Sequence, residues 1–599
     1  MRAPRTHITD NRQFGERKVD KKYALLRLFK YLKPSLPIFI AVILGNICGV
    51  ALSLLGPYIS GVAIAEIKTD GTTDFAAITR YCVILLVVYA VSEIINYITT
   101  IGMAAIARRM TKAMRGDLFK KLVHLPVGYF DARQAGDVIS VLSYDIDTVG
   151  VSLANDIVLV LKSVVQIVGS LVMMIVIAAP LVLVFAITIP LSFLTTRYIA
   201  KRAHPLFRKR SAKLGELNGF GEEMLSGQKT TKAYNREEEI LAQFEMRNGE
   251  AATAYTKAEF NGTISGPAVN FINNLSLTLI STLGALMYAF AWGGIGIKQI
   301  SSFVLYSRKF SGPINEIANV IGEFQSSIAA AERVFRVLDE QEEGVGDKNL
   351  SQLDDVRGEV SIENVSFGYI PGKTVIKNFN LHANKGDLIA IVGHTGAGKT
   401  TIINLLMRFY DADAGVIKID GKDITEVTRS SLRKAFTMVL QDTWLFAGTV
   451  YENIAYGCEG ATRERVEEVC KAAKIHSFIT CLPQGYDTYL TDNAVNISKG
   501  QKQLLTIARA MLSDSPMLIL DEATSNVDTR TEQIIQSAMT SLMEGRTCFV
   551  IAHRLSTIRH ADNILVMEDG NVVEQGTHED LMKSGGAYAR LYASQFESY

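Results

Sequence analysis

The chain has 599 residues and an almost balanced charge, with 62 lysines and arginines against 61 aspartates and glutamates. A single hydrophobic core rarely extends beyond about 250–300 residues, so this length indicates more than one domain. A net charge of +1 argues against a protein held on nucleic acid by bulk electrostatics. The six cysteines show no CxxC spacing, and we expect buried apolar side chains in a reducing compartment rather than disulfides or metal ligands.

The N-terminal tail carries a short helical pattern ahead of the first long apolar segment. Leu25, Leu28, Phe29 and Leu32 follow the i, i+3, i+4, i+7 spacing of one helix face. We interpret residues 1–35 as a cytoplasmic tail with an amphipathic elbow helix in the inner membrane interface. A soluble helix packed on a cytoplasmic domain is the alternative. A cleaved signal peptide is not expected, because about 35 mostly polar residues precede the first apolar run.

Residues 36–330 contain six apolar segments long enough to cross a membrane, since about 20 apolar residues span the hydrocarbon core. The segments are residues 38–64, 82–106, 157–178, 181–199, 271–291 and 300–321. Pro180 separates the third segment from the fourth and predicts a tight helical hairpin. The long loops after spans two and four contain few helix breakers, so we expect helices to continue beyond the membrane there.

Lysines and arginines predict the orientation of these spans. They gather in the tail and after spans two and four, whereas the loops at 69–74, 179–180 and 293–298 are short and poor in cations. The positive-inside rule therefore places the tail, both long loops and everything after span six in the cytoplasm. We expect a multi-pass protein of the cytoplasmic membrane of a prokaryote.

The spans contain few polar residues that indicate a cargo. Glu93 lies in the middle of the second apolar segment, and Asn270, Asn273 and Asn274 lie at the start of the fifth. An ionisable group at membrane depth is a functional candidate. Glu93 can equally join two helices through a hydrogen bond, and the sequence leaves both interpretations open.

After a linker at residues 331–358, residues 359–599 have the pattern of a soluble α/β domain. Residues 388–392 form a short apolar run typical of a buried parallel strand, and a helical pattern follows at 401–410. The loop between them reads Gly393-His394-Thr395-Gly396-Ala397-Gly398-Lys399-Thr400. Strand, glycine-rich loop and helix in this order predict a phosphate-binding P-loop. Its backbone amides would wrap the phosphates, Lys399 would reach the β- and γ-phosphates, and the Thr400 hydroxyl would bind Mg²⁺.

Other apolar runs lead to candidate catalytic residues. One run ends in Asp521 and Glu522, and the carboxyl ends of parallel strands are where such sheets bind ligands. Asp521 suits the shell of Mg²⁺, and Glu522 suits a base that activates the attacking water. His553 follows another run and would sense the γ-phosphate, while Gln441 follows a third. Taken alone, neither of these two residues is informative.

Together these motifs resemble those of ABC transporters, and the whole chain is similar to an exporter-type half-transporter. In family order they are Tyr369 as the adenine-stacking aromatic, 393–400 as the Walker A loop, Gln441 as the Q-loop, Ser498-Lys499-Gly500-Gln501 as the signature, Asp521-Glu522 as the end of Walker B, Ser525-Asn526-Val527-Asp528 as the D-loop and His553 as the switch histidine. Less specifically, Tyr129-Phe130-Asp131 and Glu223-Met224-Leu225-Ser226-Gly227 resemble the two cytoplasmic loops that dock on nucleotide domains.

The resemblance implies a membrane domain of six transmembrane helices fused to an α/β P-loop NTPase domain of the ABC type with a helical subdomain. It also implies ATP and Mg²⁺ as ligands, and a dimer that holds two ATP molecules, each between one P-loop and the opposite signature. The residues expected to bind ATP are Tyr369, Gly393, His394, Thr395, Gly396, Ala397, Gly398, Lys399, Thr400, Thr401, Ser498, Gly500 and Gln501. Thr400, Gln441 and Asp521 are expected at the metal, and Glu522, His553 and Gln441 in catalysis.

The signature departs from the usual Leu-Ser-Gly-Gly-Gln, because Lys499 replaces the first glycine after Ile497 and Ser498. This change is harmless if Lys499 points into solvent. The sharper hypothesis is a heterodimer, in which this chain supplies Glu522 to a competent ATP site and its altered signature caps a slow or inactive one. The partner would be a different half-transporter with an intact signature and a degenerate Walker B motif.

The favoured function is ATP-driven export or flipping of hydrophobic or amphipathic small molecules, such as drugs or lipids. Peptide export is less favoured, because no N-terminal peptidase-like domain is present, and a homodimer with a drifted signature is a further alternative. An ATP-driven regulator or channel that moves no substrate ranks last. Besides the second subunit, we expect membrane lipid and a small amphipathic substrate as partners, and no nucleic acid.

Overall fold

The computed structural model of the chain describes residues 21–67, 73–441, 443–491, 497–521, 528–552 and 555–596. Backbone contacts divide the chain into two compact units. The helical unit comprises Val19–Lys120 and Gly136–Asp339. The sheet unit comprises Lys121–Ala135 and the described residues from Glu340 to Phe596. The sheet unit is therefore discontinuous in sequence, because a short segment of the first half of the chain belongs to it.

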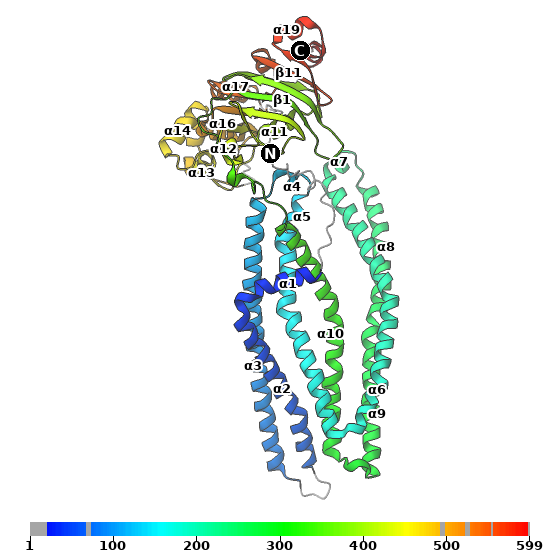
Figure 1. Cartoon of the computed structure of the whole chain (residues 1–599). Coiled ribbons are helices and arrows are strands. Elements are labelled where there is room, and N and C mark those ends of the chain that lie inside the picture. Colours follow the sequence, from blue (N-terminus) through cyan, green and yellow to red (C-terminus); the bar gives the residue numbers. More distant parts are fainter. Residues whose placement is uncertain are drawn as a thin grey trace. The chain divides into compact units, whose positions relative to one another are not determined.

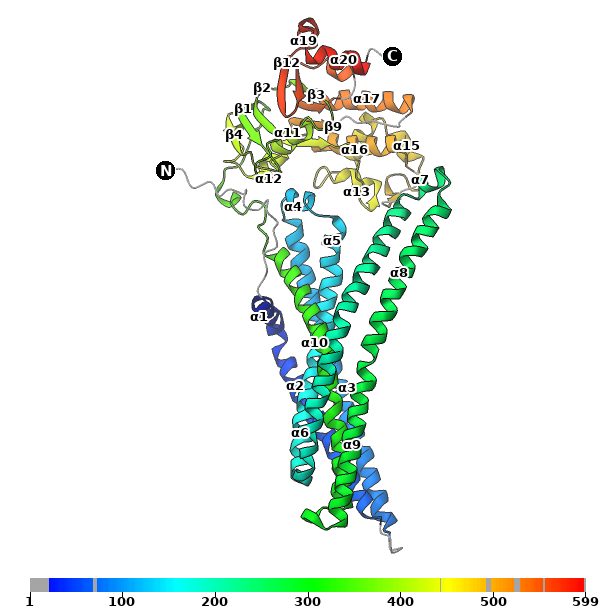
Figure 2. The ribbon, with the colours of Figure 1, turned by 90° about the vertical axis from the view of Figure 1, so that its right-hand side faces the viewer.

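The helical unit is built from long helices (Figure 1). These are α1 (Lys21–Leu32), α2 (Leu36–Ala65), α3 (Phe75–Val123), α6 (Ile146–Ser226), α8 (Glu237–Thr263), α9 (Ser265–Ala289) and α10 (Ile297–Leu338). Short segments join them, namely η2 (Lys33–Ser35), α5 (Ala135–Ser140), the π-helical η3 (Val141–Asp145), α7 (Gln228–Ala233) and η4 (Trp292–Gly294). The second half of α6 runs beside α8 in both views (Figures 1 and 2).

Four stretches of helix are long and apolar enough to cross a membrane, among the residues that the structure describes. They are Lys22–Ala65, Phe75–Val123, Ala135–Ser226 and Glu237–Ala289. The third stretch holds two predicted spans, because the backbone of α6 leaves the helical region at Ala178 (φ −159°, ψ 75°), where two helices meet at a kink. The hairpin predicted at Pro180 is thus confirmed. The sixth predicted span lies within α10, whose apolar character is interrupted by Arg308, Lys309 and Glu316.

Small residues let α2 and α3 approach closely. A Cβ added to Gly45 would lie 2.6 Å from Cγ2 of Thr99, and one added to Gly49 would lie 2.7 Å from Oδ1 of Asn96. The Ser92 hydroxyl also donates to the backbone carbonyl of Gly49 at 2.9 Å. Helices in membranes associate through such close packing, since lipid tails are as apolar as the side chains. The first two spans therefore form a tightly packed pair.

Helix α1 forms as predicted, but its buried stripe differs from the predicted one. Phe29, expected on that stripe, is 63% exposed, whereas Ala24 is fully buried. Arg27 forms an ion pair with Asp339 and lies over the ring of Phe335 at 5.0 Å. These contacts turn Ala24 toward the end of α10 and Phe29 away from it. Helix α1 therefore packs on α10 within the helical unit, and its place in a membrane interface stays a prediction.

The sheet unit contains three sheets. A four-stranded antiparallel sheet has the order β2 (Ile376–Ala383), β1 (Val360–Phe367), β4 (Ala414–Ile419) and β5 (Lys422–Asp423). A six-stranded sheet has the order β12 (Asn571–Gly576), β11 (Asn563–Glu568), β3 (Leu388–Gly393), β10 (Thr547–Ile551), β9 (Met517–Asp521) and β6 (Phe436–Val439). Adjacent strands of this sheet pair in parallel, except that β11 and β12 pair antiparallel. The third sheet pairs β7 (Gly448–Thr449) with β8 (Tyr489–Leu490).

Helices cover both faces of the six-stranded sheet, and more form a helical subdomain. They are α11 (Lys399–Leu406), α12 (Arg429–Lys434), α13 (Val450–Ala455), α14 (Arg463–Ala472), α15 (His476–Thr480), α16 (Lys499–Ser513), α17 (Thr529–Met543), α18 (Leu555–Arg559), α19 (His578–Ser584) and α20 (Ala587–Phe596), with the short η5 (Asp347–Asn349) and η6 (Gly485–Asp487). Figure 2 shows α16 and α17 side by side. The short α4 (Val127–Asp131) also belongs to this unit.

The apolar run of β3 is explained by two cores, one on each face of the sheet. Ile389 and Ile391 belong to one core, and Ala390 and Val392 belong to the other. Successive side chains of a strand point to opposite faces, so a strand covered on both sides needs apolar residues at every position. The buried parallel strand predicted from this run is thus confirmed.

The predicted helix at 401–410 is shorter than expected. Helix α11 ends at Leu406, and Arg408 adopts a left-handed conformation (φ 50°) that no continuing helix accommodates. The buried Arg408 guanidinium donates to the carbonyls of Ile424 and Val427 at 2.8 and 3.0 Å, which holds this turn in place. Helix α10 runs to Leu338, so the first residues of the predicted linker are helical.

The expectation of buried cysteines is wrong for most of them. All six are free, and only Cys470 and Cys548 are buried, whereas Cys48, Cys82, Cys458 and Cys481 are exposed. Cys48 and Cys82 lie on the surfaces of α2 and α3, where predicted spans need apolar residues outside as well as inside. Burial raises the pKa of the Cys548 thiol to about 12 and that of Cys470 to about 11.

Candidate nucleotide-binding site

The P-loop connects β3 to α11 through a tight turn that contains three glycines with positive φ angles. Gly393, Gly396 and Gly398 have positive φ angles of 151°, 87° and 102°, a region that side chains with a Cβ rarely adopt. A Cβ on Gly393 would lie 2.3 Å from the backbone oxygen of Met567, and one on Gly398 would lie 2.8 Å from Cδ1 of Ile376. Glycine is therefore required at Gly393 for conformation and for space, and at Gly398 for its conformation. Such a loop ahead of a helix N-terminus presents backbone amides to phosphate.

Lys399 begins α11 and closes the loop. Its ammonium donates to the backbone carbonyls of Gly393 at 2.7 Å and His394 at 3.1 Å. Burial lowers the pKa of this ammonium, while the carboxylate of Asp521 acts in the opposite direction. A partly buried cation bonded only to neutral carbonyls in the part of the chain described here has a strong electrostatic preference for an anionic ligand.

The metal-binding residues predicted beside the loop come from adjacent parts of the sheet. Asp521 ends β9 and pairs in register with Ile551 of β10, which pairs with Ile391 of β3. The Asp521 carboxylate thus lies at the same edge of the sheet as the P-loop, as its effect on Lys399 indicates. Thr400 occupies the first turn of α11. Gln441 is exposed just after β6, the strand beside β9.

These donors fit Mg²⁺ that is held mainly by phosphate and water. Among the described residues, no three His, Cys, Asp or Glu side chains gather into a metal-binding group. Mg²⁺ prefers oxygen ligands and is usually bound through one or two protein groups together with substrate phosphates. A hydroxyl from Thr400, a carboxylate from Asp521 and an amide oxygen from Gln441 have this chemistry.

Tyr369 packs beside the first turn of α11. Its hydroxyl donates to Oγ1 of Thr401 at 3.2 Å and accepts from Nδ2 of Asn404 at 3.0 Å. Its ring meets the rings of Phe367 and Tyr410 edge-on, with centroids 5.0 Å apart in each case. The aromatic residue predicted to stack on adenine is therefore next to the P-loop helix and belongs to an aromatic cluster.

The signature segment caps a helix. Ser498 is the N-cap of α16, and its Oγ accepts from the backbone N–H of Gln501 at 3.2 Å. In return, Oε1 of Gln501 accepts from the backbone N–H of Ser498 at 2.9 Å, which completes a capping box. Gly500 is buried, and Lys499 is exposed. The cap forms with lysine in place of glycine, and the Ser498 hydroxyl proton stays available to an acceptor outside the helix.

Several predicted residues lie outside the described part of the chain. These are Glu522, Ser525, Asn526, Val527 and His553. Their roles stay predictions. Asp528 is the last residue of the D-loop motif, and its carboxylate accepts from the backbone N–H of Thr531 at 3.0 Å to cap α17. Backbone and side-chain hydrogen bonds from Thr531 lower the pKa of Asp528.

The first predicted docking segment contacts the nucleotide fold within the sheet unit. The Tyr410 hydroxyl donates to Oδ2 of Asp131 at 2.6 Å, and a Cβ added to Gly128 would lie 2.9 Å from the Tyr410 ring. The prediction for 129–131 is thus confirmed. Tyr410 was missed, because nothing in an aromatic residue after a helix indicates a partner 279 positions away. The second segment, 223–227, lies at the end of α6, which stops at Ser226 with Gly227 as its C-cap, and its docking stays a prediction.

Ion pairs tie the linker to the same fold. Arg433 forms two bonds of 2.7 Å to the Glu343 carboxylate, and Arg429 lies 2.7 Å from Asp347. The backbone N–H of Glu343 also donates to the carbonyl of His124 at 2.8 Å, just before α4. The segment before β1 and the segment before α4 are therefore held together within the sheet unit.

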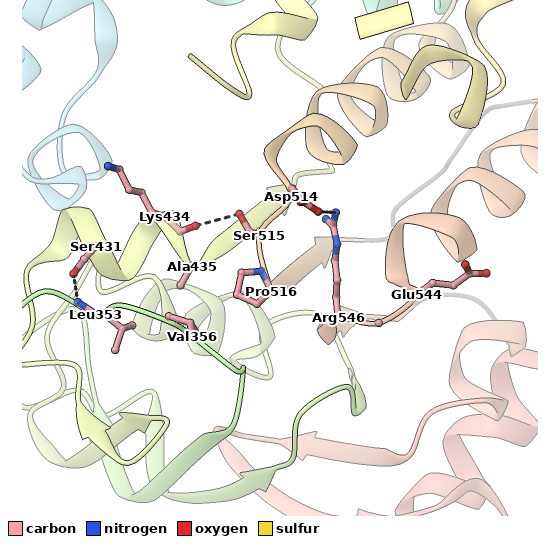
Figure 3. Close-up of a pocket in the computed structure, with 11 residues that line it drawn as sticks. Leu353, Val356, Ser431, Lys434, Ala435, Asp514, Ser515, Pro516, Glu544 and Arg546 are labelled. Carbon is pink, nitrogen blue, oxygen red and sulfur yellow. Dashed lines mark hydrogen bonds and ion pairs between the residues drawn. The ribbon is translucent and has the colours of Figure 1, made fainter. Parts of the chain in front are cut away.

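A pocket of about 380 Å³ lies at the opposite edge of the six-stranded sheet (Figure 3). Pro516 and Arg546 line it just before β9 and β10 begin, and Arg546 lies 3.7 Å from Asp514. The P-loop follows the carboxyl end of β3, which is parallel to β10. This pocket therefore does not belong to the candidate nucleotide site.

Comparisons with known proteins agree with this arrangement. Residues 39–314 match the family described as "ABC transporter transmembrane region", and residues 376–525 match the family described as "ABC transporter". A solved chain titled "Structure of a bacterial Atm1-family ABC exporter with ATP bound" superposes with a TM-score of 0.76 at 30% sequence identity, covering 94% of this chain and 98% of that one.

Three relatives are similar over nearly their full lengths. The "Uncharacterized ABC transporter ATP-binding protein YfiC" of Bacillus subtilis is 42% identical over 96% of this chain and 95% of its own. A "Fatty acid ABC transporter ATP-binding/permease protein" of Mycobacterium bovis is 39% identical over 94% of this chain and 95% of its own. An "ATP-dependent lipid A-core flippase" of Hahella chejuensis is 34% identical over 97% of this chain and 99% of its own.

Proposed function

Since the chain belongs to the ABC transporter family as a fused half-transporter of the exporter type, we propose that it exports or flips hydrophobic or amphipathic molecules, lipids above all, across the cytoplasmic membrane. The family couples ATP hydrolysis to transport, with ATP and Mg²⁺ at the nucleotide site. The observation that carries the proposal is a chain of contacts from the P-loop helix: Tyr369 bonds to Thr401 and packs on Tyr410, and Tyr410 bonds to Asp131 of α4. A fold that only hydrolysed ATP would have no use for such a contact.

Lipids are the favoured cargo for two reasons. Two of the relatives described above are named for fatty acid and for lipid A-core. The proposed spans also offer mostly apolar surface, with charges confined to a few positions. Drugs of similar amphipathic character are compatible with the same surface. Peptide export remains the alternative, and no observation favours it.

At the nucleotide site each residue has a distinct role in the proposal. Lys399 and the loop amides bind the β- and γ-phosphates, and Tyr369 stacks on the adenine. Thr400, Asp521 and Gln441 hold Mg²⁺, which offsets charge on the phosphates when it is bound. Glu522 activates the attacking water while His553 contacts the γ-phosphate. Phosphoryl transfer requires mainly such positioning and charge neutralisation.

Half-transporters act as dimers, and we propose that the second subunit is a different chain. The support is Lys499, which places a cation beside the capping box where the family has glycine. A signature altered in this way would cap a slow site. The chain's own P-loop and Glu522 would be completed by an intact signature from the partner. A homodimer is the alternative, and the intact cap of α16 is compatible with it.

The function is tested by ATP-dependent lipid uptake into inverted membrane vesicles that contain the full-length chain. We expect a fluorescent lipid to move only with ATP and Mg²⁺, and Glu522→Gln to abolish both uptake and steady-state hydrolysis while ATP stays bound. Unimpaired hydrolysis by Glu522→Gln would remove this residue from the catalytic role. ATP hydrolysis without movement of any lipid, drug or peptide would favour a regulator over a transporter.

A further inference from the structure

Helix α2 contains a proline that leaves one carbonyl without its helical partner. Pro57 has no backbone N–H, so the carbonyl four residues earlier, that of Ser53, lacks the usual intrahelical donor. The ammonium of Lys309 on α10 donates to this carbonyl at 3.0 Å. An ammonium group from another helix thus supplies the hydrogen-bond donor that the Ser53 carbonyl lacks within α2. The Tyr306 hydroxyl, one turn earlier on α10, donates to the next carbonyl of α2, that of Leu54.

Lys309 lies where four helices of the helical unit converge. Its ammonium is 5.7 Å from the ring centroid of Tyr89 on α3. From α6, Nε2 of Gln166 donates to the backbone carbonyl of Lys309 at 3.2 Å. The side chain is half-buried. Ser53, Tyr89, Gln166 and Lys309 all fall within predicted spans, so this junction is at membrane depth.

A second cation lies close to the first. Lys162 precedes Gln166 by four residues on α6, so the two side chains share one helix face, one turn apart. The charge of Lys162 on α6 repels the Lys309 ammonium, and the charge of Glu93 on α3 attracts it. Ser163, beside Lys162, donates to the Glu316 carboxylate at 3.3 Å. Glu316 is therefore directed to the neighbouring serine.

The two lysines are not neutralised by the protein within the part of the chain that the structure describes. No ion pair within 4.0 Å joins Lys162 or Lys309 to a carboxylate there, and the single bonded acceptor of Lys309 is a neutral carbonyl. Charges at membrane depth are costly and are retained where they have a function. Satisfying the Pro57 break needs only a hydrogen-bond donor, such as a serine or glutamine, and does not explain a pair of positive charges.

We propose that Lys309 and Lys162 bind the anionic head of the transported lipid, a carboxylate or a phosphate. The inference rests on the proposed function and narrows it to lipids with a charged head. An oxyanion at this junction accepts charge-assisted hydrogen bonds from both ammonium groups and offsets their mutual repulsion. The acyl chain extends along the apolar helix surfaces. Glu93 lowers the net positive charge of the junction, so a single negative charge on the lipid head balances it.

The experiment measures ATPase stimulation of the full-length protein in nanodiscs of zwitterionic phosphatidylcholine. The probes are palmitate, phosphatidate and the uncharged methyl palmitate. We expect palmitate, phosphatidate or both to stimulate, and methyl palmitate not to. Lys309→Gln and Lys162→Gln should each raise the half-maximal concentration of the anionic probe at least about tenfold, because a charge-assisted bond is lost. Lys309→Arg, which keeps the charge, should stay close to the parent protein.

Lys298→Gln is the matched control. Lys298 lies on the same helix α10, donates to the Tyr58 hydroxyl at 3.4 Å and lies 4.7 Å from that ring, yet it is outside the junction. In Lys298→Gln, the half-maximal concentration of the anionic probes for ATPase stimulation should equal that of the parent protein. The double variant Pro57→Ala/Lys309→Gln separates charge from helix repair, since alanine returns a backbone N–H to the Ser53 carbonyl. It should respond to anions as weakly as Lys309→Gln alone.

The stimulation pattern identifies the head group that binds or overturns the inference. Stimulation by palmitate alone identifies a carboxylate head, and stimulation by phosphatidate alone identifies a phosphate. Equal responses of Lys309→Gln and the parent protein, recovery of the response in the double variant, or equal stimulation by methyl palmitate would each overturn the inference. If neutral lipids move with ATP and Lys309→Gln has no effect, the proposed function stands without this site. If no lipid moves, the proposed function itself fails.

Discussion

The ammonium of Lys399 is the one side-chain charge that the P-loop places among its own carbonyls. Both of its bonds, to Gly393 and His394, are to neutral oxygens, although burial disfavours its charge. Phosphate is a stronger acceptor than either carbonyl, so binding of ATP replaces weak partners by strong ones. Lys399 thus stabilises the loop through its bonds to Gly393 and His394, and its ammonium forms stronger hydrogen bonds once a phosphate binds.

Lys399→Ala should lower the ATPase rate by at least about 10²-fold, because one positioned donor to developing charge is lost. The measurement is phosphate release by the reconstituted protein at saturating Mg-ATP. Lys385→Ala, which removes an exposed lysine of the same unit, is the control and should leave the rate unchanged. A Lys399→Ala rate within threefold of the parent protein would contradict the role given to this ammonium.

At the scale of elements, the capping box of α16 joins helix stability to nucleotide chemistry. Ser498→Ala should lower the free energy of unfolding of the nucleotide fold by about 1 kcal/mol, as expected for an N-cap. It should also lower the ATPase activity of the chain expressed alone, because in a dimer of this chain Ser498 would face a phosphate at both ATP sites. Thr462→Ala removes the equivalent cap of α14 and is the matched control. Equal loss of stability with equal activity in both variants would reduce Ser498 to a structural cap.

Helix α4 is linked to the adenine side of the site through Tyr410. Tyr410→Phe removes the bond to Asp131 but keeps the ring against Tyr369 and Gly128. We expect basal ATP hydrolysis to persist and the amount of lipid moved per ATP to fall. Tyr451→Phe, which removes a hydroxyl bond to Ala461 in the helical subdomain, is the control. Unchanged coupling in Tyr410→Phe would show that this bond does not transmit motion.

The sequence predicts local elements well and distant contacts poorly. The P-loop, β3 and the hairpin at Pro180 depend on residues close together in the chain, so their patterns suffice. The bond from Tyr410 to Asp131 and the bond from Lys309 to Ser53 join positions 279 and 256 residues apart. Such pairs depend on how whole helices pack, and a single sequence carries no signal for them. The stripe of α1 was misjudged for the same reason, because Arg27 and Asp339 decide which face turns inward.

For the whole molecule, the open question with a direct test is the identity of the second subunit. We expect the chain expressed alone to hydrolyse ATP slowly, and co-expression with a half-transporter that has an intact signature to raise the rate. In that complex, Glu522→Gln should abolish hydrolysis, whereas replacing Lys499 by glycine should restore activity to the chain alone. A stable, fully active dimer of this chain by itself would exclude the heterodimer.

The discontinuity of the sheet unit has a consequence for exchanging parts between exporters. A fragment cut at residue 359 would lose Glu343 and Asp347, whose partners Arg433 and Arg429 would be left without them. A cut at residue 340 keeps those pairs but leaves Tyr410 without Asp131. A chimaera that exchanges the nucleotide-binding fold between exporters therefore loses the native contacts of α4 with that fold unless residues 121–135 are exchanged as well. The smallest part of this chain that can be exchanged with these contacts intact consists of two segments, residues 121–135 and the residues from 340 onward.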